Sequence, residues 1–200
     1  MPWTILPFEL SQTFGKAAGG LAMMVHTGHY AVLTPDAPED YLATGNTLVC
    51  AGVALLPHDP ADNIGMMHLY SAAEHFEAGQ QAAQAHAAKG WQKFAAELAP
   101  KGAFTAIAFG GRKPDAHEKR FKDYTASTWL NDGLMESIQQ AGFIKTIDDL
   151  RYRDANDVII ARRTQQVIIG EQSRDILKTI RQLQYTEKAK PIYNAWTIPG

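Results

Sequence analysis

The clearest hydrophobic pattern in the chain is a pair of apolar runs separated by a polar turn. Residues 46–56 are NTLVCAGVALL, residues 64–70 are IGMMHLY, and PHDPADN lies between them. Continuous apolar runs of this length, bounded by Pro, Asp and Asn, are typical of buried strands. The pattern therefore predicts two strands in a hairpin-like order.

Helical patterns follow in two places. The stretch rich in Ala and Gln after Ser71 favours helix as far as Leu98. It opens with SAAE, a capping-box sequence in which Ser71 would cap the helix. Gly79 and Gly90 weaken this helix, so two helical pieces are possible. A second helix is predicted over residues 127–142, which end in glycine.

The rest of the chain adds strands, one polar loop and a third helix. Apolar runs predict strands, the last of which can fold as a hairpin, and a charged stretch predicts a surface loop. Near the C-terminus, apolar residues at helical spacing predict an amphipathic helix. In chain order, these elements are a strand over 103–111, the loop 112–125, strands over 143–152 and 157–169, and a helix over 173–185. The pattern therefore predicts a mixed α+β protein.

Composition narrows the class of protein. The chain has 200 residues, of which 46% are hydrophobic and 20% charged, as expected for one globular domain. Its net charge of −2 gives no overall bias toward nucleic acid or an anionic membrane. The single cysteine, Cys50, excludes an intrachain disulfide and cysteine-rich metal sites.

The N-terminal sequence bears on where the protein works. It has no basic leader followed by a continuous apolar core, so we expect no ordinary signal peptide. The apolar piece GGLAMMV is too short to span a bilayer, so we expect no membrane insertion. We expect a cytoplasmic protein, or an effector that a specialised injection system delivers into a host cytoplasm.

Cys50 and His68 are the main candidates for chemistry. They are 18 positions apart, one on each predicted strand, and paired antiparallel strands could bring them within hydrogen-bonding reach. Cysteine catalysis needs a thiolate, a base that forms it and a group that orients the base. A hydroxyl such as that of Thr44 could orient the imidazole. The alternatives are an inert core cysteine, a hydrogen-bonded core histidine and a threonine in a turn.

The other polar motifs suggest less. The pair His26 and His29 lacks nearby carboxylates, and the sequence GGRK at 110–113 lacks the frame of a nucleotide loop. RRTQQ at 162–166 has no interleaved aromatic residues for a nucleic-acid platform. We therefore expect no metal, no cofactor and no nucleic-acid partner.

In order and spacing, the candidate residues resemble the active-site stretch of the CheD family of chemoreceptor glutamine deamidases. That family has a Gly-Ser-Cys strand, a YDP turn and a Gly–Met strand that carries a histidine. Here Cys50, the HDP turn at 58–60 and IGMMH ending at His68 stand in that order, and Thr44 lies six positions before the cysteine, as in the family. Fainter similarity extends the match to about residues 42–170. Deamidating toxins of the cytotoxic-necrotizing-factor and lethal-factor types share the same arrangement and fold.

The resemblance implies a fold and a division of the chain. The fold would be α+β, with a mixed β-sandwich core and flanking helices. The chain would be a single domain over 1–200, with the deamidase-like core at about 42–170 and additions at 1–40 and 171–200.

The resemblance also implies an activity that needs no cofactor. Cys50 would attack the side-chain amide of a glutamine on a protein substrate, His68 would move the proton and Thr44 would orient His68. The substrate would be a chemoreceptor or a host regulatory protein. An amine in place of water would make the same site a transglutaminase.

Three departures from the family pattern leave the substrate open. Val49 precedes the cysteine where the family has Ser or Gly, Ala51 follows it where the small residues of the family are only partly kept, and Arg112 follows the double glycine where the family has alanine. Two rival functions remain. One is a non-catalytic protein-binding domain of the same fold, and the other is a papain-like cysteine hydrolase that uses His117. An activated Cys50 would react fast with iodoacetamide at neutral pH, and a buried inert one slowly.

Overall fold

The computed structural model describes residues 3–7, 20–45, 47, 49–113, 116–117, 119–152, 157–170 and 184–193. Within these residues the chain forms two six-stranded sheets and three helices. Both sheets contain parallel and antiparallel pairs. The protein is therefore an α+β protein with two mixed sheets, in agreement with the sequence-based prediction.

One sheet, called the first sheet below, combines N-terminal strands with strands from the second half of the chain. In spatial order, its strands are β1 (Thr4–Pro7), β10 (Gln166–Gly170), β9 (Asp157–Ala161), β4 (Glu39–Gly45), β2 (Leu21–Met24) and β11 (Gln184–Thr186). Strand β4 pairs antiparallel with β9 and parallel with β2. Strand β4 therefore lies inside the sheet.

The other sheet, called the second sheet, contains the predicted hairpin. In spatial order, its strands are β12 (Lys190–Pro191), β3 (His29–Leu33), β6 (Ile64–Tyr70), β5 (Cys50–Pro57), β7 (Phe104–Phe109) and β8 (Ile144–Asp149). Strands β5 and β6 pair antiparallel, as the sequence predicts. Both lie inside the sheet, which explains why their sequences are almost continuously apolar.

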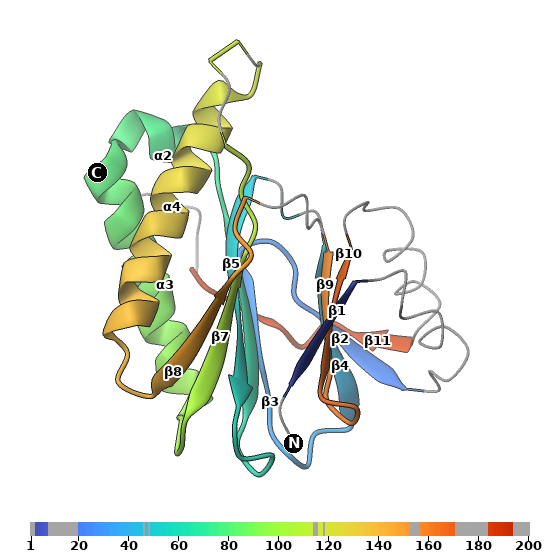
Figure 1. The fold of residues 1–200 in the computed structure, drawn as a ribbon. Helices are drawn as coiled ribbons and strands as arrows, with labels where there is room; N and C mark the ends of the chain where they lie inside the picture. The colour runs from blue at the N-terminus through green and yellow to red at the C-terminus, as the bar shows by residue number, and fades with distance from the viewer. Residues whose placement is uncertain are drawn as a thin grey trace.

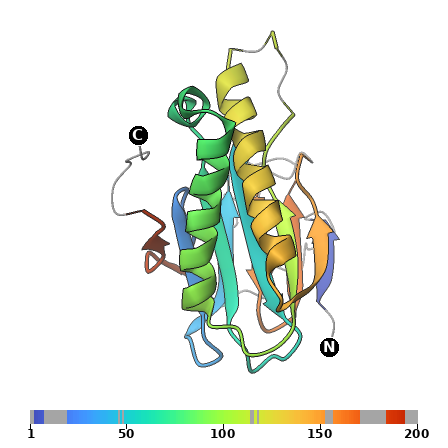
Figure 2. The same ribbon diagram turned by 90° about the vertical axis from the view of Figure 1, so that its left-hand side faces the viewer.

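Helices cover one outer face of the second sheet (Figures 1 and 2). They are α2 (Ala73–Ala78), α3 (Gln80–Leu98) and α4 (Phe121–Gln140). Apolar side chains of α3 and α4, such as Phe94 and Leu134, form one core cluster with Ala51, Val53 and Leu55 of β5. The opposite face of the second sheet turns toward the first sheet.

A second core cluster fills the space between the two sheets. Ala54 and Leu56 of β5 contribute to it from the second sheet, and Leu42 and Val158 contribute from the first. Because neighbouring residues of a strand point to opposite faces, alternate positions of β5 serve the two clusters. Packing on both faces fixes the position of β5 between the helices and the first sheet.

The segments that the family resemblance treats as additions supply strands to both sheets. The described parts of residues 1–40 contribute β1, β2, β3 and the start of β4. In the C-terminal segment, β11 pairs with β2 and β12 pairs with β3. These strands extend the sheets that contain residues 42–170.

Several details differ from the sequence-based predictions. The capping role of Ser71 is wrong, because Ala72 precedes α2 and the Ser71 hydroxyl donates to the carbonyl of Asp123, 2.9 Å away. Helix α4 begins at Phe121, so the predicted loop is helical in its last five residues. The possible division into two helical pieces is confirmed at Gly79, which separates α2 from α3 with a φ of 89°, whereas Gly90 lies within α3 and does not interrupt it. The predicted helix over 173–185 lies outside the described residues, apart from two residues of β11.

Among the described residues, no helix is both long enough and apolar enough to cross a bilayer.

We predict that Gly52→Ala destabilises the fold, because an added Cβ would lie 2.2 Å from a ring atom of Phe109, which is fully buried. Overpacking of this kind costs about 1–3 kcal/mol. Urea unfolding followed by circular dichroism measures the effect. The control is Gly142→Ala, where an added Cβ meets nothing within 4 Å. Equal free energies of unfolding for the two variants would contradict the prediction.

Candidate functional site

Pairing between β5 and β6 sets the relation between Cys50 and His68. Cys50 is paired with Tyr70, and Gly52 is paired with His68. Cross-strand partners lie on the same face of a sheet, and so do residues two apart on one strand. Cys50 and His68 are therefore diagonal neighbours on one face, and such neighbours are about 7–8 Å apart. The sheet thus places the two residues on one face, but His68 Nε2 makes no hydrogen bond to Cys50 in this structure, so the predicted hydrogen-bonding reach is not seen.

Thr44 reaches His68 from the other sheet. Its Oγ1 atom lies 2.7 Å from His68 Nδ1 and 2.7 Å from the carbonyl oxygen of Val25, and all of its side chain is buried. A hydroxyl has one proton, and a carbonyl can only accept. The Thr44 hydroxyl therefore donates to Val25 and accepts from the protonated Nδ1 of His68. This contact joins β4 of the first sheet to β6 of the second.

The contact with Thr44 fixes the tautomer of the His68 imidazole. With the proton on Nδ1, the Nε2 atom of His68 carries a lone pair. That atom is buried and has no hydrogen-bond partner among the residues that the structure describes. The pKa of His68 falls to about 4, mainly because of burial; a hydrogen bond to the Val25 backbone opposes the fall, and the nearby His26 and His29 add to it. His68 is therefore a neutral imidazole at pH 7, with a basic nitrogen available for a proton.

Cys50 is enclosed by aromatic side chains. It is 2% exposed and packs with Val49 and Tyr124, while Tyr70 lies against the same cluster. Burial raises the pKa of the Cys50 thiol to about 12, although the backbone N–H of Ser71 and the charge of Arg120 oppose the rise. In this conformation the sulfur is therefore a protonated thiol, and a Cys–His ion pair is disfavoured.

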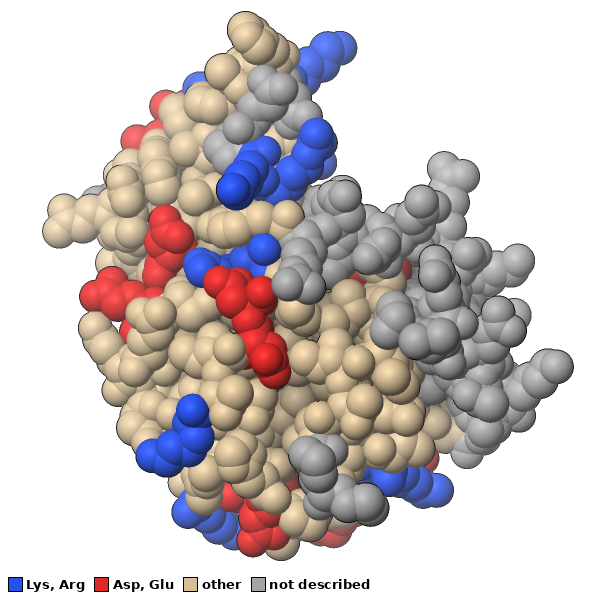
Figure 3. Space-filling view, viewed as in Figure 1, with Lys and Arg blue, Asp and Glu red and all other residues tan. Residues whose placement is uncertain are grey.

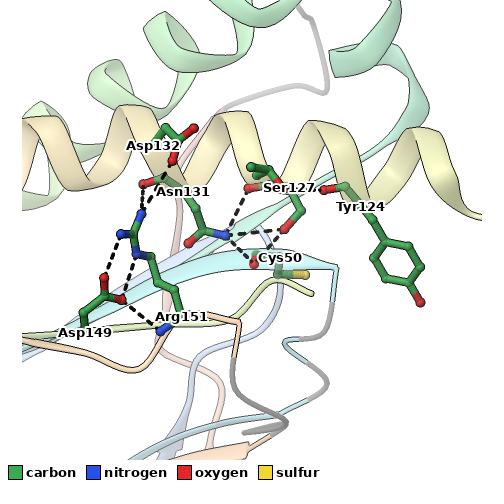
Figure 4. A network of polar contacts seen from close by, with 8 residues as sticks. Cys50, Tyr124, Ser127, Asn131, Asp132, Asp149 and Arg151 are labelled. Atoms are coloured by element: carbon green, nitrogen blue, oxygen red, sulfur yellow. Dashed lines mark hydrogen bonds and ion pairs between the residues drawn. The ribbon is translucent and has the colours of Figure 1, made fainter. Parts of the chain in front are cut away.

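Helix α4 holds the main chain of Cys50 (Figure 4). The Ser127 hydroxyl donates to the Cys50 carbonyl oxygen at 3.1 Å, and the amide Nδ2 of Asn131 donates to the same atom at 3.4 Å. Asn131 and Ser127 are four residues apart, so they share one face of the helix, and both are buried. These two donors fix the peptide that follows Cys50.

A second set of contacts anchors α4 to the end of β8 (Figure 4). The guanidinium of Arg151 makes two hydrogen bonds to Asp149, of 2.9 and 2.7 Å, and donates to the main-chain carbonyl of Asn131 at 3.4 Å. It also lies 3.7 Å from a carboxylate oxygen of Asp132. Arg151 therefore links β8 to the helical turn that carries Asn131.

The double glycine after β7 lets the chain pass close to Cys50. Gly110 has a φ of 90° and Gly111 a φ of 80°, which favour glycine. A Cβ on Gly110 would lie 2.7 Å from the Cys50 carbonyl oxygen, and the N–H of Gly111 donates to the carbonyl of Thr47. The sequence predicts only a turn here. The structure adds a close approach to the backbone of residues 47–50.

Sequence reasoning missed the residues that support the site. Val25, Ser127, Asn131 and Arg151 are not among the candidate residues that the sequence predicts. A serine and an asparagine four residues apart on an otherwise apolar helix face could have indicated Ser127 and Asn131, because buried polar groups need partners. The carbonyl of Val25 leaves no signal in the sequence.

The other candidate residues lie elsewhere. His117 is exposed in the segment before α4, whereas His68 lies on the strand next to that of Cys50. His58 contacts Thr105 Oγ1 at 3.0 Å near the other end of β5. Among the described residues, no group of three His, Cys, Asp or Glu side chains could hold a metal ion.

Comparison with known proteins gives no further identification. No family model matches the chain, and no curated protein matches it significantly.

We predict that acid weakens the fold through His68. The ordinary pKa of 6.5 falls to about 4 on folding, so between these values the unfolded chain binds the additional proton. The free energy of unfolding is therefore highest above pH 6.5 and falls as the pH drops toward 4, with His68 contributing up to about 3 kcal/mol. Burial also lowers the pKa of His75 and His86, so they contribute in the same direction.

Urea unfolding between pH 7.5 and 4.5 tests this prediction. His68→Asn keeps a donor for Thr44 but lacks the titrating ring, so its stability should fall less with acid than that of the wild type. His117→Asn, at an exposed position, is the control and should follow the wild type. An equal fall in all three proteins would show that His68 does not contribute.

We predict that Cys50 reacts slowly with iodoacetamide in the folded protein. A pKa raised from 9.0 to about 12 leaves roughly a thousandfold less thiolate at neutral pH, and burial limits access further. Intact-mass spectrometry at pH 7.5 gives a clean measurement because the chain has one cysteine. The control is the same protein unfolded in urea. Native alkylation within about tenfold of the unfolded rate would indicate an exposed or activated thiol.

Proposed function

We propose that the protein hydrolyses the side-chain amide of a glutamine on a protein substrate. Cys50 is the nucleophile, His68 is the base and Thr44 orients His68. One observation carries the proposal: the Thr44 hydroxyl lies between the Val25 carbonyl and His68 Nδ1, which leaves the buried Nε2 atom as an acceptor. A cysteine hydrolase needs this tautomer, with the basic nitrogen on the side of the ring away from the orienting group.

The reaction proceeds in two halves. The Cys50 sulfur attacks the amide carbon while its proton passes to His68 Nε2, and the tetrahedral intermediate collapses when His68 protonates the departing ammonia. A water molecule then gives a proton to His68 and attacks the thioester. When the thioester bond breaks, the proton returns to Cys50, and the products are glutamate and ammonia. If an amine attacks instead of water, the product is a crosslinked amide.

The neutral resting state agrees with this sequence of steps. Because the pKa of Cys50 is raised and that of His68 is lowered, the proton stays on sulfur until the substrate is bound. The low exposure of both side chains means that the substrate must reach them through a rearrangement of the residues around Cys50. In this mechanism, uncovering the site and forming the thiolate are coupled.

The proposal also covers the fold family, the substrate and the compartment in which the protein acts. Two mixed sheets with helices on one outer face support a β-sandwich of the kind found in CheD and in the cytotoxic-necrotizing-factor toxins. The substrate is then a chemoreceptor or a host regulatory protein. The protein acts in the cytoplasm of its own cell, or in a host cytoplasm after secretion.

A second candidate function is a non-catalytic protein-binding domain of the same fold. The observation that favours it is the enclosure of Cys50, whose burial and raised pKa suit an inert core cysteine. This function predicts that Cys50→Ala keeps all binding and that no glutamine is converted. The papain-like alternative is weaker, because His117 is exposed in a loop.

Measuring deamidation in matched variants tests the proposal. Purified protein is incubated with candidate chemoreceptors and host regulatory proteins, and ammonia release and conversion of glutamine to glutamate are measured by enzyme assay and mass spectrometry. Cys50→Ala should lower activity by on the order of 10⁴-fold or more. Full activity in Cys50→Ala would refute the proposal.

The role of Thr44 has its own matched pair. Thr44→Val keeps the shape but removes the hydroxyl that orients His68, and should lower kcat by on the order of 10²-fold. Thr44→Ser keeps the hydroxyl and should remain within about tenfold of the wild type. Equal kcat in the two variants would show that the hydroxyl has no positioning role.

A further inference from the structure

Cationic side chains gather where the chain approaches helix α4. Residues 112–122 contain five Lys and Arg and two acidic residues, a net charge of +3 in a chain of net charge −2. Figure 3 shows Lys and Arg atoms grouped at the top of the molecule, where α4 begins. The five Lys and Arg residues of this segment, called the basic rim below, are Arg112, Lys113, Lys119, Arg120 and Lys122.

The basic rim lies beside Cys50. Tyr124 packs in the same cluster as Cys50, and its ring is approached by two guanidinium groups. Arg112 lies 5.5 Å from the ring centre and Arg120 lies 5.9 Å from it. Arg120 is close enough to lower the pKa of the Cys50 thiol, against the larger effect of burial. Arg112 and Arg120 therefore lie against the aromatic ring that packs beside Cys50.

Neighbouring residues neutralise only part of the basic rim. Arg120 forms an ion pair of 3.0 Å with Asp123, and Lys122 forms one with Glu77. Lys113 and Lys119 are exposed, and neither has an ion-pair partner among the residues that the structure describes. The N-terminus of α4 adds partial positive charge at the same place. The basic rim therefore keeps a net positive charge next to Tyr124.

From this placement we propose that the basic rim selects protein segments in which the target glutamine is flanked by acidic residues. The inference rests on the deamidase function proposed above and specifies its substrate. Complementary charge raises the rate of encounter and sets the orientation of the bound segment. The neighbouring aromatic ring does not suit base stacking, because two guanidinium groups already lie over Tyr124. An acidic polypeptide is therefore the better fit than a nucleic acid.

Three synthetic peptides test the proposal with the full chain. Each has one central glutamine, flanked by glutamate, serine or lysine, and ammonia release gives kcat/KM. We expect kcat/KM for the acidic peptide to exceed that for the neutral peptide by about tenfold at low salt, since several exposed charge pairs act together. The lysine peptide should be the poorest. The preference should shrink to about twofold at high salt, where exposed charges are screened.

Charge reversal supplies the matched variants. The double variant Lys113→Glu, Lys119→Glu should remove the preference for the acidic peptide. The control double variant Lys101→Glu, Lys145→Glu makes the same change in net charge at two exposed positions, one just before β7 and one at the start of β8. It should keep the order of the three peptides. An unchanged preference in the first double variant would overturn the proposal.

A binding measurement separates this proposal from the deamidase function. Fluorescently labelled peptides are titrated with Cys50→Ala protein, with and without the rim substitutions, and anisotropy is recorded. Tighter binding of the acidic peptide, lost when Lys113 and Lys119 are reversed, supports the rim even if no peptide is deamidated. Equal binding of all three peptides overturns the rim proposal while leaving deamidation to be judged by Cys50→Ala kinetics. Tighter binding of a labelled oligothymidine than of the acidic peptide also overturns it.

Discussion

The arrangement of the site depends on one buried hydroxyl. Thr44 Oγ1 donates to the Val25 carbonyl and accepts from His68, so it connects the two sheets where no bulk water can replace either bond. An unsatisfied buried donor or acceptor costs about 1–3 kcal/mol, so each partner restricts the others. The same two bonds determine the tautomer of His68. The availability of the Nε2 lone pair therefore depends on this contact between the two sheets.

The nucleophile side of the site is built by different elements. Ser127 and Asn131 of α4 hold the Cys50 carbonyl, and the close approach of Gly110 fixes the neighbouring backbone. Strands, helix and turn therefore restrain the main chain of Cys50, while the thiol itself lies among aromatic side chains. This enclosure raises the pKa of the thiol, so the sulfur of the resting protein stays protonated and unreactive. In the proposed mechanism, the substrate reaches the site through a rearrangement around Cys50, and the basic rim orients an acidic segment there.

Much of the secondary structure could be predicted, because local sequence determines it. Strand β6 matches the predicted run at both ends, and of the two glycines expected to weaken the helical region, Gly79 divides it and Gly90 does not. The errors occur where contacts between residues far apart in the chain determine the local structure. Ser71 was assigned to a helix cap but bonds to Asp123 of α4, and α4 extends back to Phe121, whose ring contacts Phe76. Strands β2 and β3 have little periodicity and exist through pairing with β4 and β6.

The sequence by itself determined which residues could carry the chemistry. It contains one cysteine, a histidine on the next strand and a threonine six positions before the cysteine, and the alternating geometry of paired strands brings Cys50 and His68 to one face. Only the tertiary structure decided the state of those residues. The tautomer of His68, the raised pKa of Cys50 and the hold of α4 on its carbonyl all arise between segments far apart in the chain. The physical reason is that burial and buried hydrogen bonds depend on which groups from distant segments come into contact. The local sequence pattern does not specify those contacts.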